Sequence, residues 1–280
     1  MRPPIALSIA GSDPSGGAGI QADLKTFSAL GVFGTAVITA LTAQNTQGVD
    51  GIHLPGGAFV REQITTLLDD VYVDATKIGM LANAETANAV ADVIQERRED
   101  FGTIVLDPVM VSTSGDMLLD EEAASVLRER LLPLSDVITP NIPEAAFLLD
   151  ANPATTPEEM HQQGEQLREL GARLALVKGG HLRGAESIDV FVHEHGTELL
   201  RGVMFNTRNT HGTGCTLSSA IAAQFAKITQ SGEGDEITVL FSAREFLASA
   251  VENAIDWEIS KHPETGHGPT NHLITLDAVR

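Results

Sequence analysis

The sequence has one cysteine, few aromatic residues and no long apolar run. Cys215, being alone, cannot form an intrachain disulfide, which agrees with a reducing compartment. The longest early apolar run, residues 5–10, ends at Gly11 and is too short for a signal-peptide core or a membrane span. Aromatic residues make up only 4%, whereas there are 26 glycines, as in compact proteins with many tight turns. We therefore expect a cytoplasmic globular protein.

Positive charge is also scarce. The chain has 18 lysines and arginines against 38 aspartates and glutamates, so its formal net charge is -20. A field of this sign repels phosphate backbones and anionic lipid headgroups, which disfavours nucleic acid and membranes as partners. A small anionic ligand would need local help from backbone amides, a lysine or Mg²⁺.

Several common catalytic motifs are missing. Residues 11–19 (GSDPSGGAG) fit neither GxGxxG nor the Walker form, because Gly17 stands where the Walker form requires lysine. The absence of Gly-x-Ser-x-Gly disfavours a serine hydrolase. The C-terminal histidines lack the spacing of a zinc motif, so we expect surface positions for His262, His267 and His272.

The hydrophobic pattern alternates between strands and helices. Short runs rich in Val and Ile predict buried strands at residues 5–10, 37–41, 76–80, 103–106, 136–139 and 174–177. Amphipathic segments predict helices at residues 20–30, 59–71, 84–97, 121–131 and 158–170. A hairpin at residues 187–192 and 198–205 follows, then helices at residues 215–228 and 239–259. This order predicts an α/β fold with a mainly parallel sheet, helices on both faces and a ligand site at the strands' carboxyl ends.

No linker, repeat or low-complexity tract divides the chain, so we expect a single domain over residues 1–280. One helix start is well marked, because Thr156 supplies a cap, Pro157 the first helical position and Glu159 the third. Gly171 follows where that helix should end.

Two glycine clusters lie where strands or loops lead into helices. Residues 11–19 would let a small ligand approach bare backbone, although an ordinary strand-to-helix turn explains them equally well. Residues 209–215 (NTHGTGC) lead into an apolar helix, whose first amides favour an anion. Cys215 on that first turn should have a lowered pKa and could accept a substrate proton, but a lone cysteine is more often a packing residue.

Five segments together carry a resemblance to a known family. They are residues 11–27 (GSDPSGGAGIQADLKTF), 76–81 (TKIGML), 136–144 (DVITPNIPE), 177–181 (VKGGH) and 209–217 (NTHGTGCTL). In this order they resemble the hydroxymethylpyrimidine/phosphomethylpyrimidine kinases of thiamine biosynthesis, from about residue 5 to about residue 225 and weakly to residues 266–269. The resemblance implies a ribokinase-like three-layer αβα sandwich with a mainly parallel central sheet that binds ATP without a Walker loop.

The resemblance also implies the transfer machinery. Gly212, Thr213 and Gly214 would form the anion hole around the transferring phosphate. Cys215 would stand where sugar kinases of the superfamily place a catalytic aspartate, which makes it the candidate base. Phosphoryl transfer relies chiefly on positioning and charge neutralisation, so a modest base would suffice.

The same resemblance implies a nucleotide and metal site. Lys178, Asn141 and Thr210 would contact ATP, while Asp107 and Glu144 would lie near its phosphates and Mg²⁺. Asp107, Lys178 and Glu144 also have simpler explanations. Asp107 could be a turn carboxylate, an isolated lysine is usually solvated, and Glu144 also completes a capping box with Asn141. The two roles of Glu144 are compatible.

For the acceptor substrate, the resemblance implies contacts from Gln44, Gly11, Asp23, Met80 and Val109. The amide of Gln44 offers both a donor and an acceptor to an aminopyrimidine edge. Met80 and Val109 would supply apolar contact to the ring, although core packing also explains both.

These observations predict ATP- and Mg²⁺-dependent phosphorylation of 4-amino-5-hydroxymethyl-2-methylpyrimidine, and of its monophosphate to the diphosphate. Pyridoxal kinase is the alternative activity, since relatives with this fold act on similar heteroaromatic alcohols. A pyrimidine-binding protein without catalysis and a module from a larger thiamine-synthesis enzyme are further alternatives. The resemblance suggests a homodimer.

Overall fold

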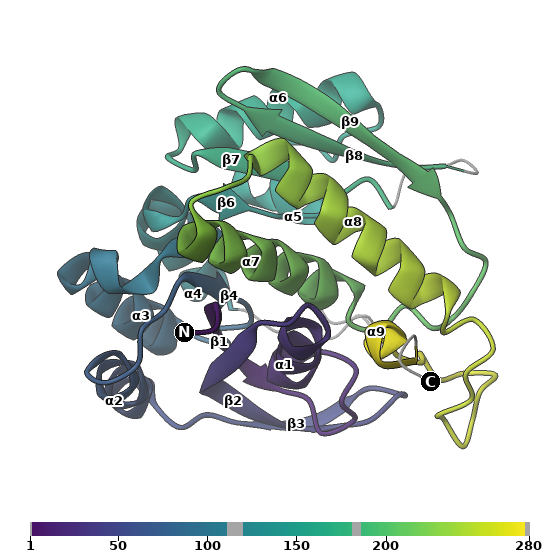
Figure 1. Cartoon of the computed structure of the whole chain (residues 1–280), viewed down its shortest axis with the longest axis horizontal. Helices are drawn as coiled ribbons and strands as arrows, with labels where there is room; N and C mark the ends of the chain where they lie inside the picture. Colours follow the sequence, from purple (N-terminus) through teal and green to yellow (C-terminus); the bar gives the residue numbers. More distant parts are fainter. Residues whose placement is uncertain (1, 111–119, 181–185, 278–280) are drawn as a thin grey trace.

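One sheet organises the chain (Figure 1). Within residues 2–110, 120–180 and 186–277, which the computed structural model describes, nine strands pair in the order β3-β2-β1-β4-β5-β6-β7-β8-β9. The strands are β1 (Ile5–Ser12), β2 (Phe33–Gln44), β3 (Val49–His53), β4 (Ala75–Ile78), β5 (Thr103–Leu106), β6 (Val137–Ile138), β7 (Leu174–Val177), β8 (Glu186–His193) and β9 (Gly196–Val203). The adjacent strands β2, β1, β4, β5, β6 and β7 pair in parallel, whereas the pairs β2–β3, β7–β8 and β8–β9 are antiparallel. The predicted mainly parallel sheet is confirmed.

Helices cover both faces of this sheet. The helices are α1 (Gly19–Ala29), α2 (Gly57–Leu68), α3 (Ala84–Glu96), α4 (Glu121–Val126), α5 (Ile142–Leu148), α6 (Pro157–Glu169), α7 (Thr213–Ser231), α8 (Glu236–Glu252) and α9 (Ile274–Asp277). Helices α1, α7 and α8 lie on one face and α2 to α6 on the other (Figure 1). This is the predicted three-layer αβα sandwich. No helix of the described residues is long and apolar enough to cross a membrane.

The central strands bury both of their faces. In β1, Leu7 and Ile9 join the core under α2 to α6, whereas Ala6 joins the core under α7 and α8. In β5, Ile104 joins the core under α2 to α6, and Val105 joins the core under α7 and α8. A strand buried on both sides needs apolar residues at successive positions, which explains the short continuous apolar runs in the sequence.

Helix caps fall where the sequence predicts them. The Thr156 hydroxyl accepts the N–H of Glu159 and starts α6, and Gly171 has a φ of +122° just beyond its end. Asn141 and Glu144 form the predicted capping box, which starts α5. These ends therefore depend on local chemistry that a sequence displays.

The predicted helix over residues 239–259 is too long, because α8 ends at Glu252. Beyond it, the side-chain amide of Asn209 donates to the carbonyls of Ala254, at 2.6 Å, and Trp257, at 3.0 Å. The Asn209 side chain thus ties the segment just beyond α8 to the loop before α7. The apolar pattern alone could not show that contact.

Other differences are smaller. Strand β3 was not predicted, since its five residues (VDGIH) form no apolar run, are mostly exposed and pair only with β2. Strand β2 is longer than residues 37–41, which places Gln44 at its last position. The helix predicted over residues 121–131 is α4 followed by a π-helical turn, Leu127–Leu131. His181, in one of the quoted motifs, lies outside the described residues.

The predicted surface position of His272 is wrong. His262 is exposed and His267 is half-buried, but His272 is buried and its Nε2 lies 2.9 Å from the Thr216 hydroxyl on α7. Burial lowers the pKa of His272 to about 4, so the ring is neutral at pH 7. The C-terminal segment thus packs on the helix that follows the second glycine cluster.

Candidate active site

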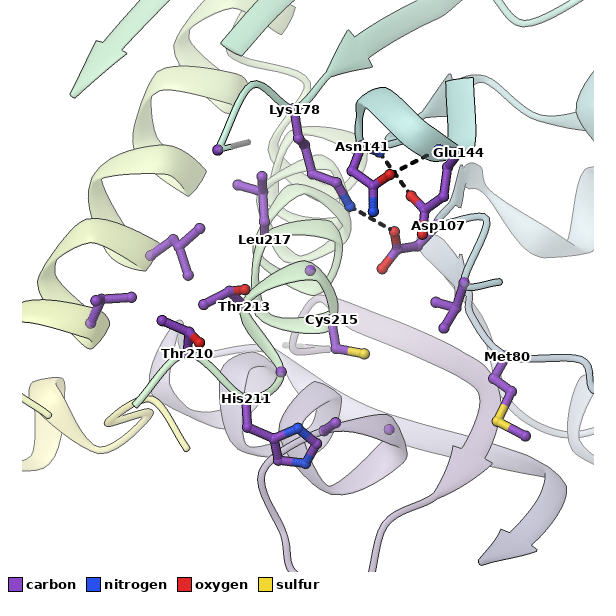
Figure 2. A pocket seen from close by; sticks show the side chains of 18 of the residues that line it. Met80, Asp107, Asn141, Glu144, Lys178, Thr210, His211, Thr213, Cys215 and Leu217 are labelled. Carbon is purple, nitrogen blue, oxygen red and sulfur yellow. Dashed lines mark hydrogen bonds and ion pairs between the residues drawn. The ribbon is translucent and has the colours of Figure 1, made fainter. Parts of the chain in front are cut away.

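A cavity of about 700 Å³ opens where the parallel strands end (Figure 2). Nearly all the predicted site residues line it: Gly11, Gln44, Met80, Asp107, Val109, Asn141, Glu144, Lys178, Thr210, Gly212, Thr213, Gly214 and Cys215. Only Asp23 of the predicted set does not. The β-α alternation brings these segments together because the ends of parallel strands share one edge of the sheet.

One end of the cavity carries charges. Asp107 follows β5 and Lys178 follows β7, and the Lys178 ammonium lies 3.1 Å from the Asp107 carboxylate (Figure 2). Burial alone would raise the pKa of Asp107, but Lys178 and Lys77 hold it below its usual value. Burial would likewise lower the pKa of Lys178, but Asp107 and Glu144 raise it. Both groups are therefore charged at neutral pH.

Glu144 also lines this end of the cavity, and its carboxyl group binds a proton more tightly than that of Asp107. Its side chain accepts the Asn141 N–H at 2.8 Å, so its capping role is present in the structure. Burial raises the pKa of Glu144 to about 7; Lys178 opposes this effect and the negative charge of Asp107 adds to it. This carboxyl group gains or loses its proton near neutral pH, which suits a site where a cation or phosphate binds.

The charged end fits Mg²⁺ when phosphates are present. Mg²⁺ usually takes one or two carboxylates and completes its shell with phosphate oxygens and water. Asp107 and Glu144 supply two carboxyl groups on the same cavity wall. Among the described residues there is no group of three or more His, Cys, Asp or Glu side chains placed to hold a metal ion. Asp107 and Glu144 could therefore hold Mg²⁺ together with phosphate oxygens.

The start of α7 faces these charges. Gly212 precedes the helix in the left-handed conformation, with a φ of +80°, and no described side chain caps it. The Thr213 N–H donates to the Thr210 carbonyl at 3.3 Å, so the next amides, those of Gly214 and Cys215, are the ones that can face an anion. A Cβ on Gly214 would lie 3.4 Å from the Lys178 Nζ and 3.6 Å from an Asp107 oxygen. The candidate anion hole and the charged residues therefore border the same space.

Cys215 does not have the lowered pKa expected from its place on the first helical turn. The thiol is half-buried, and burial raises its pKa to about 11, although the charge of Lys77 opposes this shift. Loss of hydration thus outweighs the helix dipole. At neutral pH the residue is a thiol, which can donate a hydrogen bond but is a weak proton acceptor.

Asp23 lies beneath the cavity, so the prediction that it contacts substrate is not supported. It is fully buried and accepts hydrogen bonds from Ser8 and Ser219, each at 2.6 Å. Its carboxylate pairs with the buried Lys77 at 2.9 Å. Burial would lower the pKa of Lys77, but Asp23 and nearby acidic groups raise it, so the lysine stays charged.

Sequence reasoning missed Lys77, although it lines the cavity floor. The available signal was a lysine within the apolar run of β4, where a buried charge requires a partner. The sequence does not show that the partner is Asp23 on α1, because the two residues meet only through the packing of α1 and α7 on the sheet.

The cavity residues predicted to contact the acceptor ring are uncharged. Gln44 ends β2, and the Thr42 hydroxyl lies 3.1 Å from its amide oxygen. A Cβ on Gly11 would lie 3.2 Å from the Met80 sulfur, so bare backbone and a thioether form adjoining walls. With Val109, these residues provide an apolar slot with one oriented amide, as expected for a flat polar ring.

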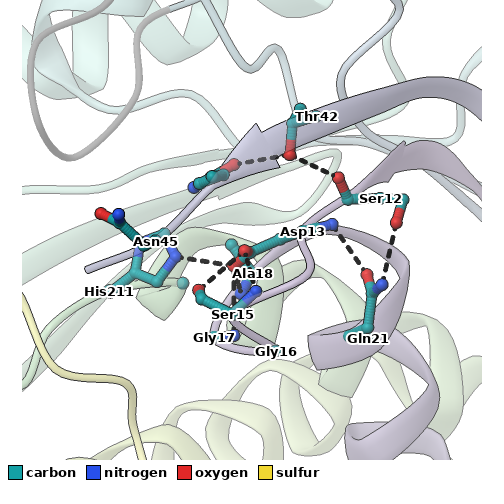
Figure 3. Close-up of polar contacts among 12 residues, drawn as sticks. Ser12, Asp13, Ser15, Gly16, Gly17, Ala18, Gln21, Thr42, Asn45 and His211 are labelled. Atoms are coloured by element: carbon teal, nitrogen blue, oxygen red, sulfur yellow. Dashed lines mark hydrogen bonds and ion pairs between the residues drawn. The ribbon is translucent and has the colours of Figure 1, made fainter. Parts of the chain in front are cut away.

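Asp13 and His211 are among the other cavity residues that sequence reasoning missed. They belong to the two glycine clusters, which were analysed for backbone and not for side chains. Asp13 accepts a hydrogen bond from His211 at 2.8 Å, so the clusters are in direct contact (Figure 3).

Comparisons with known proteins agree with this geometry. Residues 13–271 match the family model described as phosphomethylpyrimidine kinase. The hydroxymethylpyrimidine/phosphomethylpyrimidine kinase of Salmonella typhimurium is 48% identical over 268 residues, which cover 96% of this chain and 97% of the relative. A bifunctional thiamine biosynthesis protein of Geobacter sulfurreducens is 43% identical; the match covers 98% of this chain but 53% of that protein.

Solved structures give the same result. A Bacillus subtilis pyridoxal kinase in complex with ADP has a TM-score of 0.84 and 34% identity, over 98% of both chains. A Clostridium difficile phosphomethylpyrimidine kinase has a TM-score of 0.77 and 37% identity, over 88% of this chain and 99% of that one. The chain therefore belongs to the phosphomethylpyrimidine kinase family, and it is a phosphotransferase with a ribokinase-like fold.

Proposed function

We propose that the chain transfers phosphate from ATP to 4-amino-5-hydroxymethyl-2-methylpyrimidine, and then to the monophosphate of that alcohol. The observation that carries this proposal is the polarity of one cavity. Lys178, Asp107 and the start of α7 form a charged end, while Gln44 and Met80 form an uncharged end. A nucleoside triphosphate suits the charged end, and an aminopyrimidine suits the uncharged end.

The charged end would act mainly by positioning and neutralisation. Lys178, held by Asp107, directs an ammonium group at the phosphates, and the amides of Gly214 and Cys215 face the charge that develops on the transferred group. Asn141, near Lys178, and Thr210, in the loop before α7, line the same cavity, and we assign both of them contacts to ATP (Figure 2). Mg²⁺ held by Asp107, Glu144 and the phosphates would supply further charge neutralisation.

The alcohol end would select the substrate and orient its hydroxymethyl group. The amide of Gln44, oriented by Thr42, pairs with the aminopyrimidine edge, while Met80 and Val109 contact the ring. Cys215 lies between the two ends. Because its thiol remains protonated at neutral pH, we assign it a hydrogen bond to the reacting hydroxyl and only a weak role as a base.

The organisation of the chain is part of this proposal. A single domain is supported by the sheet that continues from β3 to β9. A cytoplasmic location is supported by the lone cysteine. A homodimer remains a prediction from the family resemblance.

ADP release with ATP and Mg²⁺ tests the function, with the pyrimidine alcohol, its monophosphate and pyridoxal supplied separately. We expect turnover with both pyrimidines. Turnover with pyridoxal alone would instead favour the activity named for the Bacillus subtilis structure. Pyrimidine binding without turnover on any acceptor would favour a binding protein.

A further inference from the structure

The two glycine clusters are joined by a buried hydrogen bond between side chains (Figure 3). Asp13 lies between β1 and α1, and His211 lies just before α7. The His211 Nε2 lies 2.8 Å from an Asp13 carboxylate oxygen, and the two residues are only 7% and 2% exposed. A contact between residues so far apart in the sequence fixes the distance between the segments that carry them.

Asp13 also holds its own loop together. One carboxylate oxygen accepts the N–H and the hydroxyl of Ser15, and the other accepts the N–H groups of Gly17 and Ala18. Burial alone would raise the pKa of Asp13, but the hydrogen bonds from His211 and Ser15 lower it to about 2. The group is therefore an ionised carboxylate that only accepts, so His211 must donate from Nε2.

The backbones of the two segments are in contact beside this hydrogen bond. A Cβ on Gly212 would lie 1.8 Å from the Gly17 carbonyl oxygen, and a Cβ on Gly17 would lie 2.3 Å from the His211 ring. Both glycines are needed for this close approach. The N–H of His211 also donates to the Gly268 carbonyl at 3.0 Å, which holds the same segment from its other side.

His211 precedes the candidate anion hole, but its ring points elsewhere. In Figure 2 the ring is directed away from Asp107 and Lys178. Its effect on the reaction would therefore pass through the backbone of residues 212–215. The Asp13 loop meets the alcohol end in the same way, because Gly11 and Ser12 line the cavity just before it.

We propose that Asp13 and His211 are a positioning pair, which sets the spacing between the alcohol-binding loop and the anion hole. This inference rests on the proposed function, because it assumes that the acceptor and the transferred phosphate occupy those two segments. The pair touches neither reacting atom in this assignment. It holds the two binding sites at the separation that in-line transfer requires.

The hydrogen bond is tested with His211→Leu, which removes the donor, and His211→Gln, whose amide can place an N–H close to the position of Nε2. We expect kcat of His211→Leu to fall about 100-fold, the size associated with a misplacement near 1 Å. The KM for each substrate and the directly measured Kd for ATP should change less than about threefold, because each binding site stays intact by itself. His211→Gln should recover most of kcat.

A second readout separates positioning from general damage. We expect His211→Leu to release more ADP per phosphorylated pyrimidine than the wild type, since a displaced acceptor lets water compete for the phosphate. Gly17→Ala should give the same loss of kcat and the same excess of ADP, because its Cβ forces the segments apart without removing Asp13 or His211. His193→Leu is the matched control, since His193 is also buried but lies at the end of β8, outside the cavity lining.

All values are expressed per folded molecule, counted by ATP binding. The proposal is overturned if His211→Leu keeps kcat and the ADP ratio within about threefold of the wild type, or if His211→Gln is as impaired as His211→Leu. It is also overturned if His193→Leu gives the same excess of ADP. Failure of the wild type to phosphorylate either pyrimidine would contradict the proposed function, which is a separate result.

Discussion

The side chains at the two ends of the cavity are held in place by different interactions. At the phosphate end, Asp107, Lys178 and Glu144 are charged or titratable groups whose positions and pKa values depend on one another. At the alcohol end, Gln44 and Met80 are uncharged and are positioned by β2 and by packing against backbone. The first arrangement suits the stabilisation of a changing charge, and the second suits the selection of a ring.

This difference predicts two kinetic classes of variant. Changes at the phosphate end should lower kcat, because the affected interactions are strongest in the transition state. Changes at the alcohol end should mainly raise the KM of the acceptor, because ring contacts are made equally in the ground state. The predictions below test that division, from the largest expected effect to the smallest.

Lys178→Met should lower kcat about 1000-fold, the upper range for losing one group that stabilises transition-state charge. It also leaves Asp107 without its closest cation. Steady-state kinetics with the pyrimidine alcohol measure the effect. Lys227→Met is the matched control, since this half-buried lysine lies on α7 away from the cavity lining and should keep nearly full activity. Equal loss in both variants would contradict a specific role for Lys178.

Gly214→Val should lower kcat about 100-fold, because its larger side chain enters the space beside the Lys178 ammonium and the Asp107 carboxylate. Gly214→Ala should be much milder, since a Cβ alone makes ordinary contacts there. Circular dichroism confirms that both variants fold. Near-normal turnover of Gly214→Val would contradict the assignment of an anion hole at the start of α7.

Gln44→Leu should raise the KM of the pyrimidine alcohol about 30-fold and change kcat little, which corresponds to the loss of about 2 kcal/mol of polar pairing. Leucine fills most of the same space and removes the amide. Initial rates at saturating ATP give both constants. A loss confined to kcat would place Gln44 among the transfer groups.

Activity should rise with pH through the titration of Glu144. Its pKa is raised from 4.5 to about 7, so the group is a carboxylic acid below that pH and a carboxylate above it. We expect kcat/KM for ATP to rise up to about tenfold between pH 6 and pH 8. In Glu144→Gln this part of the rise should disappear, while the titration of ATP itself remains. An unchanged profile would separate Glu144 from nucleotide binding.

Cys215→Ser should have the smallest effect, a loss of kcat of only a few-fold, well below the roughly 100-fold or more of an essential general base. The reason is the raised pKa of about 11, which leaves little thiolate to accept a proton. The pH dependence of alkylation checks that pKa directly. A loss of about 1000-fold would show that the thiolate is required after all.

The sequence predicts what local patterns determine. Strands β5 and β7 have the predicted boundaries, because short apolar runs buried on both faces end where the chain leaves the sheet. The caps at Thr156 and Asn141 are set by residues three positions apart. The place of the cavity could also be predicted, since strand ends and glycine clusters meet at one edge of a parallel sheet, whereas most of the residues that line it were implied by the family resemblance.

What the sequence did not show depends on contacts between distant segments. The pKa of Cys215 is set by burial and by Lys77, and neither is visible in a helix start. Asp23 pairs with Lys77 under the cavity instead of facing it. Helix α8 ends at Glu252, and the segment beyond it contacts the distant Asn209 amide. In each case tertiary packing outweighs the local signal.

The central claim is that one end of the cavity transfers phosphate while the other selects the acceptor. Competition between the pyrimidine alcohol and pyridoxal, measured in one reaction, tests it most directly through the ratio of their kcat/KM values. We predict that Lys178→Met lowers both rates and keeps the wild-type ratio, whereas Gln44→Leu reduces the preference for the pyrimidine about 10-fold or more. A changed ratio in Lys178→Met, or an unchanged ratio in Gln44→Leu, would contradict the claim.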